Sequence, residues 1–166
     1  IWLGVCHCNS ADAALLVNGY DTDQHDRFAN SSSFIGSSYD WSGVGRNSSG
    51  QWGTRVSDRH FVTATHHAPA TNSTLRFYAT NDPNGAYAEQ TVISRQSVLG
   101  SDLALGELSA PVFYGSVFQI NHYPLFALPD STEFIGTELF VVGRSTEPQL
   151  ANMRLGRNEV TGVISG

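Results

Sequence analysis

The sequence predicts an all-β protein, built as an antiparallel β-barrel with little helix. From Gln51 onward it consists of short runs rich in β-branched and aromatic residues, separated by turn signals, which is typical of an antiparallel barrel or sandwich. No stretch keeps a helical period of i, i+3, i+4, i+7 between capping residues. With 166 residues, 40% hydrophobic and 14% charged, the chain has the size and composition of about one folded domain.

The first residues resemble the end of an export signal. A short apolar stretch, Ile1–Val5, is followed by Ala11-Asp12-Ala13, which has the small-x-small pattern of a signal-peptidase site. We therefore expect residues 1–13 to be a remnant of an export signal and the protein to be secreted, periplasmic or at the cell surface. The only cysteines, Cys6 and Cys8, lie in this segment and are too close for an unstrained disulfide. A metal site formed by these cysteines and the histidine between them is a weak alternative.

The rest of the chain divides into an irregular part and a series of strands. Residues 14–50 are dense in Gly, Ser, Asn and Asp, and we expect them to form an irregular lead-in. The strands expected after it are Trp52–Val56, His60–Thr65, Thr74–Thr80, Thr91–Ser94, Leu103–Leu108, Val117–Ile120, Glu138–Gly143 and Glu159–Ile164. The cluster Asn81-Asp82-Pro83-Asn84-Gly85 predicts a hairpin, in which Pro presets one backbone angle and Gly supplies a positive one.

The charged residues exclude one class of partner. All nine basic residues are arginine, and against fifteen acidic residues they leave a net charge of −6. Nucleic-acid-binding domains need a basic surface, so we expect no nucleic-acid partner. No apolar run approaches the roughly 18 residues that a transmembrane helix needs, so we also expect no membrane span.

Two segments carry residue types that are suited to acid–base chemistry. In the first, the apolar run Phe61–Thr65 leads into paired histidines, His66 and His67. In the second, Asp102 directly precedes the alternating run Leu103–Leu108. An imidazole held by a carboxylate is a common device for taking a proton from a hydroxyl group. The alternatives are structural: a histidine that bonds a backbone carbonyl, and an aspartate that caps its own turn.

Both segments resemble motifs of the chymotrypsin-like (trypsin-like) serine protease family. Val62-Thr63-Ala64-Thr65-His66-His67 is similar to the family's histidine motif, approximately V-T-A-A-H-C. Asp102-Leu103-Ala104-Leu105-Gly106-Glu107-Leu108 is similar to its aspartate motif, approximately D-I-A-L-L-x-L. The resemblance extends over roughly residues 41–164. Its other parts are the hairpin leading into the histidine (Gly53–Phe61), a proline after the aspartate strand (Pro111) and a first strand of the second barrel (Leu139–Ser145).

The resemblance implies a serine-type endopeptidase that cleaves a polypeptide substrate through an acyl-enzyme, without a cofactor or a metal. It implies that His66 is the general base and that Asp102 fixes the histidine tautomer and stabilises the imidazolium. His67 stands where relatives carry a disulfide-bonded cysteine, and we expect His67 and His60 to be structural or surface residues. The resemblance also implies a first barrel over residues 51–133 and the start of a second barrel over residues 134–166.

The nucleophile motif of that family, G-D-S-G-G, occurs nowhere in the chain. Ser42-Gly43 precedes the histidine, and Ser165-Gly166 lacks the flanking Gly-Asp, so neither serine fits the role. We therefore expect the serine to lie outside this chain, on a C-terminal fragment of the same protein, and the chain alone to be inactive. The alternative is a noncatalytic β-barrel module, either a binding or adhesion domain or a degenerate protease homologue.

Two metal sites are further alternatives. A zinc site could use three histidines, but their spacing fits no zinc signature: His60, His66 and His67. A calcium loop could use three aspartates: Asp21, Asp23 and Asp26. The EF-hand pattern, however, needs Asp or Asn at position 25 and Gly at position 26, where the chain has His25 and Asp26. We expect a solvated turn there and no bound metal.

Overall fold

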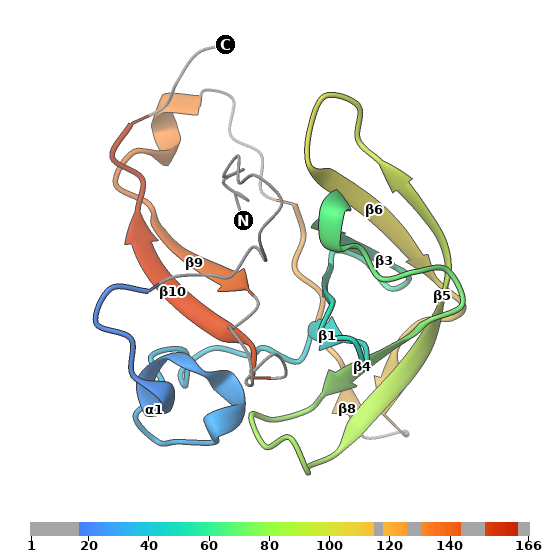
Figure 1. The fold of residues 1–166 in the computed structure, drawn as a ribbon, viewed down its shortest axis with the longest axis horizontal. Coiled ribbons are helices and arrows are strands. Elements are labelled where there is room, and N and C mark those ends of the chain that lie inside the picture. The colour runs from blue at the N-terminus through green and yellow to red at the C-terminus, as the bar shows by residue number, and fades with distance from the viewer. Residues whose placement is uncertain (1–16, 115–117, 126–130, 144–151, 163–166) are drawn as a thin grey trace.

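The computed structural model describes residues 17–114, 118–125, 131–143 and 152–162. Over these residues the protein is mostly β, with one closed barrel of six antiparallel strands and short helical turns, as the sequence predicts (Figure 1). The barrel strands are β1 (Val44–Arg46), β2 (Trp52–Arg55), β3 (His60–Ala64), β4 (Thr74–Tyr78), β5 (Tyr87–Ser97) and β6 (Leu103–Leu108). They close in the order β1-β2-β3-β6-β5-β4.

The remaining elements lie before, between and after these strands. They are α1 (Thr22–His25), the 3-10 turns η1 (Arg27–Ala29), η2 (Thr65–His67) and η3 (Ser131–Phe134), and the strands β7 (Phe113–Tyr114), β8 (Phe118–Gln119), β9 (Glu138–Gly143) and β10 (Arg154–Glu159). β7 pairs with β8, and β9 pairs with β10, each as a two-stranded sheet. No helix among the described residues is long and apolar enough to cross a membrane.

The barrel core is built from side chains that alternate with outward-facing ones along the strands. Phe61 on β3 is fully buried, and its ring lies against glycines of the neighbouring strands. A Cβ at Gly106 would come within 2.2 Å of this ring and one at Gly53 within 2.6 Å, so only glycine fits at these positions. The buried cluster consists of Phe61, Leu75, Phe77, Ala88, Val92, Leu108, Val112 and Ile120.

The predicted hairpin joins β4 to β5, although not by the expected backbone conformation. The amide of Gly85 donates to the carbonyl of Asp82 at 3.1 Å, and the Asp82 carboxylate accepts from the amide of Asn84 at 2.9 Å. Gly85 does not have a positive φ, so that detail of the prediction was wrong. A type I turn needs no positive φ. The glycine provides space instead, because a Cβ there would lie 3.1 Å from the Thr80 hydroxyl.

Other expected boundaries differ from the structure. The lead-in over residues 14–50 is not wholly irregular, since it contains α1, η1 and the first barrel strand, β1. The run expected at Thr91–Ser94 belongs to a longer strand, β5. The strand expected at Glu159–Ile164 lies earlier in the chain, as β10 (Arg154–Glu159). Leu155, on this strand, and Met153, the residue that precedes the strand, are both fully buried and hold it there. Residues 1–13, with Cys6 and Cys8, lie outside the described residues.

A second buried cluster joins the lead-in, the barrel and the β9–β10 hairpin. It consists of Phe28, Val44, Tyr78 and Met153. The buried guanidinium of Arg27 crosses it and donates to the carbonyls of Trp41, Val44, Tyr78 and Thr80 and to the Asn81 side chain. Burial lowers the pKa of Arg27 to about 10. One side chain thus bonds backbone groups from several segments.

Candidate active site

The two predicted catalytic residues meet where β3 ends and β6 begins. These strands are neighbours in the barrel, and Ala64 pairs with Leu103 at this end (Figure 1). His66 follows β3 on the turn η2, and Asp102 immediately precedes β6. The antiparallel pairing of β3 with β6 therefore brings together two residues that are 36 positions apart in the sequence.

Asp102 holds both the backbone and the ring of the histidine segment. Its carbonyl accepts from the amide of Thr65 at 2.8 Å, and its Oδ1 accepts from the amide of His66 at 3.1 Å. Its Oδ2 contacts Nδ1 of the His66 ring. Three contacts from one residue fix the position of the turn and the orientation of the imidazole.

The carboxylate determines which nitrogen of His66 can act as a base. An ionised carboxylate only accepts hydrogen bonds, so Nδ1 carries the proton in this contact, and Nε2 of the neutral ring keeps its lone pair. Within the described residues Nε2 has no hydrogen-bond partner. The His66 side chain is 50% exposed and that of Asp102 is 29% exposed. The pair can therefore take a proton from a hydroxyl group or a water that approaches from solvent.

The other histidines occupy different positions. The His67 ring lies beside that of His66, with ring centroids 4.9 Å apart. His60 lies at the opposite end of β3, where its Nδ1 is 2.9 Å from the hydroxyl of Ser57. His60 and His66 therefore do not share a site. Among the described residues, no group of three His, Cys, Asp or Glu side chains could hold a metal ion.

Two of the three aspartates of the suggested calcium loop, Asp21 and Asp26, have separate structural roles. Asp21 caps α1 by accepting from the amides of Asp23 and Gln24. Asp26 is fully buried, accepts from the Tyr20 hydroxyl at 2.7 Å and pairs with Arg154 at 3.4 Å. The expectation of a solvated turn was therefore wrong for Asp26, because a buried ion pair takes its carboxylate out of solvent.

The structure also bears on the serines. Ser42 is only 4% exposed, and its hydroxyl accepts from the amide of Asn121 at 3.0 Å. Ser165 lies outside the described residues.

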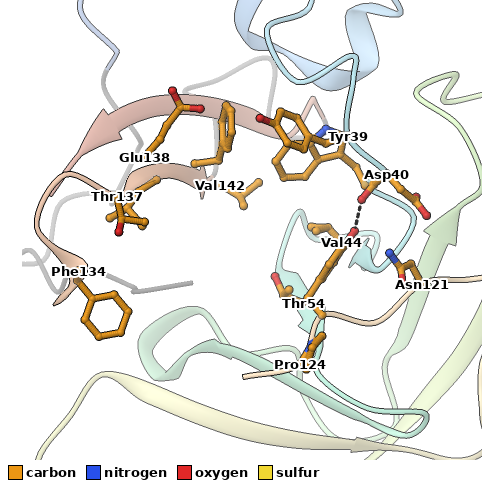
Figure 2. A pocket seen from close by; sticks show the side chains of 14 residues that line it. Tyr39, Asp40, Val44, Thr54, Asn121, Pro124, Phe134, Thr137, Glu138 and Val142 are labelled. Atoms are coloured by element: carbon orange, nitrogen blue, oxygen red, sulfur yellow. Dashed lines mark hydrogen bonds between the residues drawn. The ribbon is translucent and has the colours of Figure 1, made fainter. Parts of the chain in front are cut away.

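A cavity of about 510 Å³ lies between the barrel and β9 (Figure 2). Neither His66 nor Asp102 is among the residues that line it. Its walls are mainly apolar and aromatic, and its two carboxylates are already bonded. The Asp40 carboxylate accepts from the Ser42 amide, and Glu138 pairs with Arg157. The Tyr123 hydroxyl donates to the Asp40 carbonyl, and burial raises the pKa of Tyr123 to about 12. The described residues of the lining therefore offer no free acid–base pair.

Two residues that sequence reasoning missed contact the histidine segment. Arg95 and Gln51 both donate to the carbonyl of Ala68, two positions after His66. Neither belongs to a motif, and their positions depend on a β-bulge and a turn that no local pattern in the sequence marks.

No known family profile matches the chain, and no curated protein matches it.

Proposed function

We propose that His66 and Asp102 form the general base and its supporting carboxylate in a chymotrypsin-like serine endopeptidase. The observation that carries this proposal is the contact between His66 Nδ1 and Asp102 Oδ2, on a half-exposed imidazole whose Nε2 has no partner among the described residues. The motifs around the two residues support it, since they occur in the family's order along the chain. The nucleophilic serine, in this proposal, comes from polypeptide outside the 166 residues, such as a C-terminal fragment of the same protein.

The proposed chemistry uses both nitrogens of one ring. Nε2 of His66 takes the proton of the serine hydroxyl as the serine oxygen attacks the carbonyl carbon of a peptide bond. The negative charge of Asp102 stabilises the imidazolium that forms. His66 then gives the proton to the departing amine, which leaves an acyl-enzyme, and the same Nε2 activates the water that hydrolyses it. In this proposal the 166 residues alone are inactive, because none of their serines stands in the family's nucleophile motif.

The proposal includes a location outside the cytoplasm, in the periplasm, at the cell surface or secreted. Its basis is the apolar stretch and Ala11-Asp12-Ala13 at the start of the chain. A polypeptide is the proposed substrate, and no cofactor takes part.

The test is labelling of the natively purified protein with a fluorophosphonate, which reacts with an activated serine, combined with intact-mass measurement. We expect a labelled serine on a partner fragment or on a longer chain. His66→Ala should abolish labelling, and Asp102→Asn should slow it by about 10⁴-fold, because the amide favours the wrong tautomer. His60→Ala is the matched control, since His60 lies at the far end of the same strand, and it should label like the wild type.

The alternative function is a noncatalytic binding module, which is favoured by the absence of G-D-S-G-G from the chain. A native species that consists of the 166 residues alone and never reacts with the probe would refute the endopeptidase and support the module.

A further inference from the structure

The turn that carries His66 is too short to hold its own shape. η2 consists of three residues, and its closing bond, from the Ala68 amide to the Thr65 carbonyl, is 3.3 Å long. A single 3-10 turn forms one bond for several fixed dihedral angles, so it depends on contacts from outside. Asp102 supplies such contacts at the start of the turn, where it accepts hydrogen bonds from the amides of Thr65 and His66.

The end of the turn is held by two side chains from other parts of the barrel. The carbonyl of Ala68 accepts from Nη1 of Arg95 at 3.0 Å and from Nε2 of Gln51 at 3.3 Å. Arg95 lies on β5, and Gln51 immediately precedes β2. A carbonyl has two lone pairs, so the two donors satisfy it completely. Ala68 itself is 5% exposed.

A β-bulge directs Arg95 toward this carbonyl. The pairing of β5 with β6 shifts register between Val92 and Ser94, which makes Ile93 an extra residue. Val92 points into the barrel and is fully buried. Without the bulge, regular alternation would turn residue 95 outward. With it, Arg95 pairs with the buried Gly106 and lies on the same face of the sheet as Val92, although Arg95 itself is exposed.

Gln51 is oriented by a buried neighbour. The Asn47 amide group donates to Oε1 of Gln51 at 2.7 Å, and Asn47 is only 7% exposed. With its oxygen engaged, the Gln51 side chain presents Nε2 to the Ala68 carbonyl. The Oδ1 of Asn47 also accepts from the backbone amide of Gln51 at 3.0 Å, which fixes the backbone from which the Gln51 side chain extends.

We propose that Arg95, assisted by Gln51, is a positioning residue that holds the His66 turn against Asp102. The role in catalysis rests on the proposed function, whereas the effect on the histidine–carboxylate contact does not. Neither side chain touches a reacting atom. Both act through the Ala68 carbonyl, and their loss removes the two side-chain contacts that hold the end of the turn.

The test is proton NMR of the 166-residue protein, which reads the contact without needing a serine. An imidazole N–H that is bonded to a carboxylate gives a resonance far downfield, and His66→Gln assigns it. Arg95→Met should remove this resonance or broaden it beyond detection, while Arg95→Lys, which keeps a cationic donor, should restore part of it. Gln51→Glu should also weaken it, because an oxygen then faces the Ala68 carbonyl while the side chain keeps its size.

Arg76→Met is the matched control. Arg76 is a half-buried arginine on β4 whose guanidinium pairs with Glu89 on β5 at 2.7 Å and not with the Ala68 carbonyl. It should keep the resonance at wild-type intensity. Thermal unfolding of each variant shows whether it is folded, and Gln51→Glu provides the answer if Arg95→Met does not fold.

The outcomes separate the two proposals. If the wild type shows no His66 resonance, the proposed pair is wrong. If the wild type shows it and both Arg95→Met and Gln51→Glu keep it at full intensity, the positioning role is wrong while the His66–Asp102 pair stands. Loss of the resonance in Arg76→Met as well would mean a general loosening of the barrel, and would also refute a specific role for Arg95.

Discussion

The six-stranded barrel and the β9–β10 hairpin are held together in different ways. Each barrel strand has two paired neighbours, and the core contains fully buried Phe61, Leu75 and Phe77. The hairpin has two strands and one pairing. Its first strand, β9, is exposed at Glu138 and half-buried at every other position, although its sequence, ELFVVG, is almost entirely apolar.

The hairpin has no core of its own and is held by individual side chains, among them Phe140, whose ring centroid lies 4.9 Å from that of Tyr39. Met153 and Leu155 are fully buried, and Arg154 pairs with the buried Asp26 of the lead-in. The guanidinium of Arg154 also lies 3.7 Å from the centre of the Tyr20 ring. Isolated two-stranded sheets are marginally stable in water, so these contacts decide whether the hairpin keeps its place. The barrel, by contrast, should fold without the hairpin, and it is the barrel that carries His66 and Asp102.

The largest expected effect is the loss of the barrel core. Phe61→Ala removes a fully buried ring that packs against two glycines, and the cavity that remains cannot be filled by neighbouring backbone. We expect a loss of about 4 kcal/mol in the free energy of unfolding, measured by urea denaturation, with the hairpin lost at the same time. Ile93→Ala, at a position that is 42% exposed, is the control and should change stability by less than about 0.5 kcal/mol. A hairpin that stays ordered while the barrel unfolds would contradict this order of dependence.

The second effect should separate the hairpin from the barrel. Asp26→Asn removes the charge that faces Arg154, but it keeps an oxygen for the Tyr20 hydroxyl. We expect about 2 kcal/mol less protection of the β10 amides in hydrogen exchange, while the β6 amides stay unchanged. Asp23→Asn, on the exposed surface of α1, is the matched control and should leave both strands unchanged. Equal loss of protection in β6 and β10 would show that the two regions unfold as one unit.

The same contrast explains which elements the sequence could predict. The run Leu103–Leu108 matches β6 because its buried positions alternate, and that signal is local. β1 was not predicted, because it has only three residues and its middle residue is a glycine. That glycine packs against Phe77, which is on the neighbouring strand β4 but far away in the sequence. The position of β10 was not predicted, because the buried place of Arg154 depends on its ion pair with Asp26, which is 128 positions away in the sequence. Strands with their own alternation are predictable, whereas elements held by remote single contacts are not.

The same distinction applies to the candidate site, where some residues could be predicted from the sequence and others could not. His66 and Asp102 stand next to strands that the sequence marks clearly, so the pairing of β3 with β6 brings them together as expected. Arg95 and Gln51 could not be found, because the bulge at Ile93 and the Asn47 turn leave no pattern that distinguishes them from ordinary surface residues. The contact between His66 and Asp102 was therefore predictable from the strands beside them, whereas the contacts of Arg95 and Gln51 with the Ala68 carbonyl were not.

The smallest effect concerns Tyr123, which lies between the two regions. It packs against the cluster that includes Met153, and its hydroxyl donates to the Asp40 carbonyl. Burial raises its pKa from 10.0 to about 12, so the neutral phenol is favoured in the folded protein. Because the folded protein holds this proton more tightly than the unfolded chain does, the full contribution of Tyr123 to stability is present below pH 10. The contribution is lost as the pH rises through about 12.

Below pH 10, Tyr123→Phe should therefore lower the free energy of unfolding by about 1 kcal/mol, because the hydrogen bond is lost. The difference should become smaller as the pH approaches 12, because only the wild type is destabilised by ionisation of Tyr123. The measurement is the difference in thermal stability between wild type and variant across this range. Arg27, whose pKa burial lowers to about 10, titrates in both proteins, so the difference largely removes its contribution. A difference that stays constant with pH would mean that Tyr123 is not shielded from solvent. The cluster between the barrel and the hairpin would then be open to water.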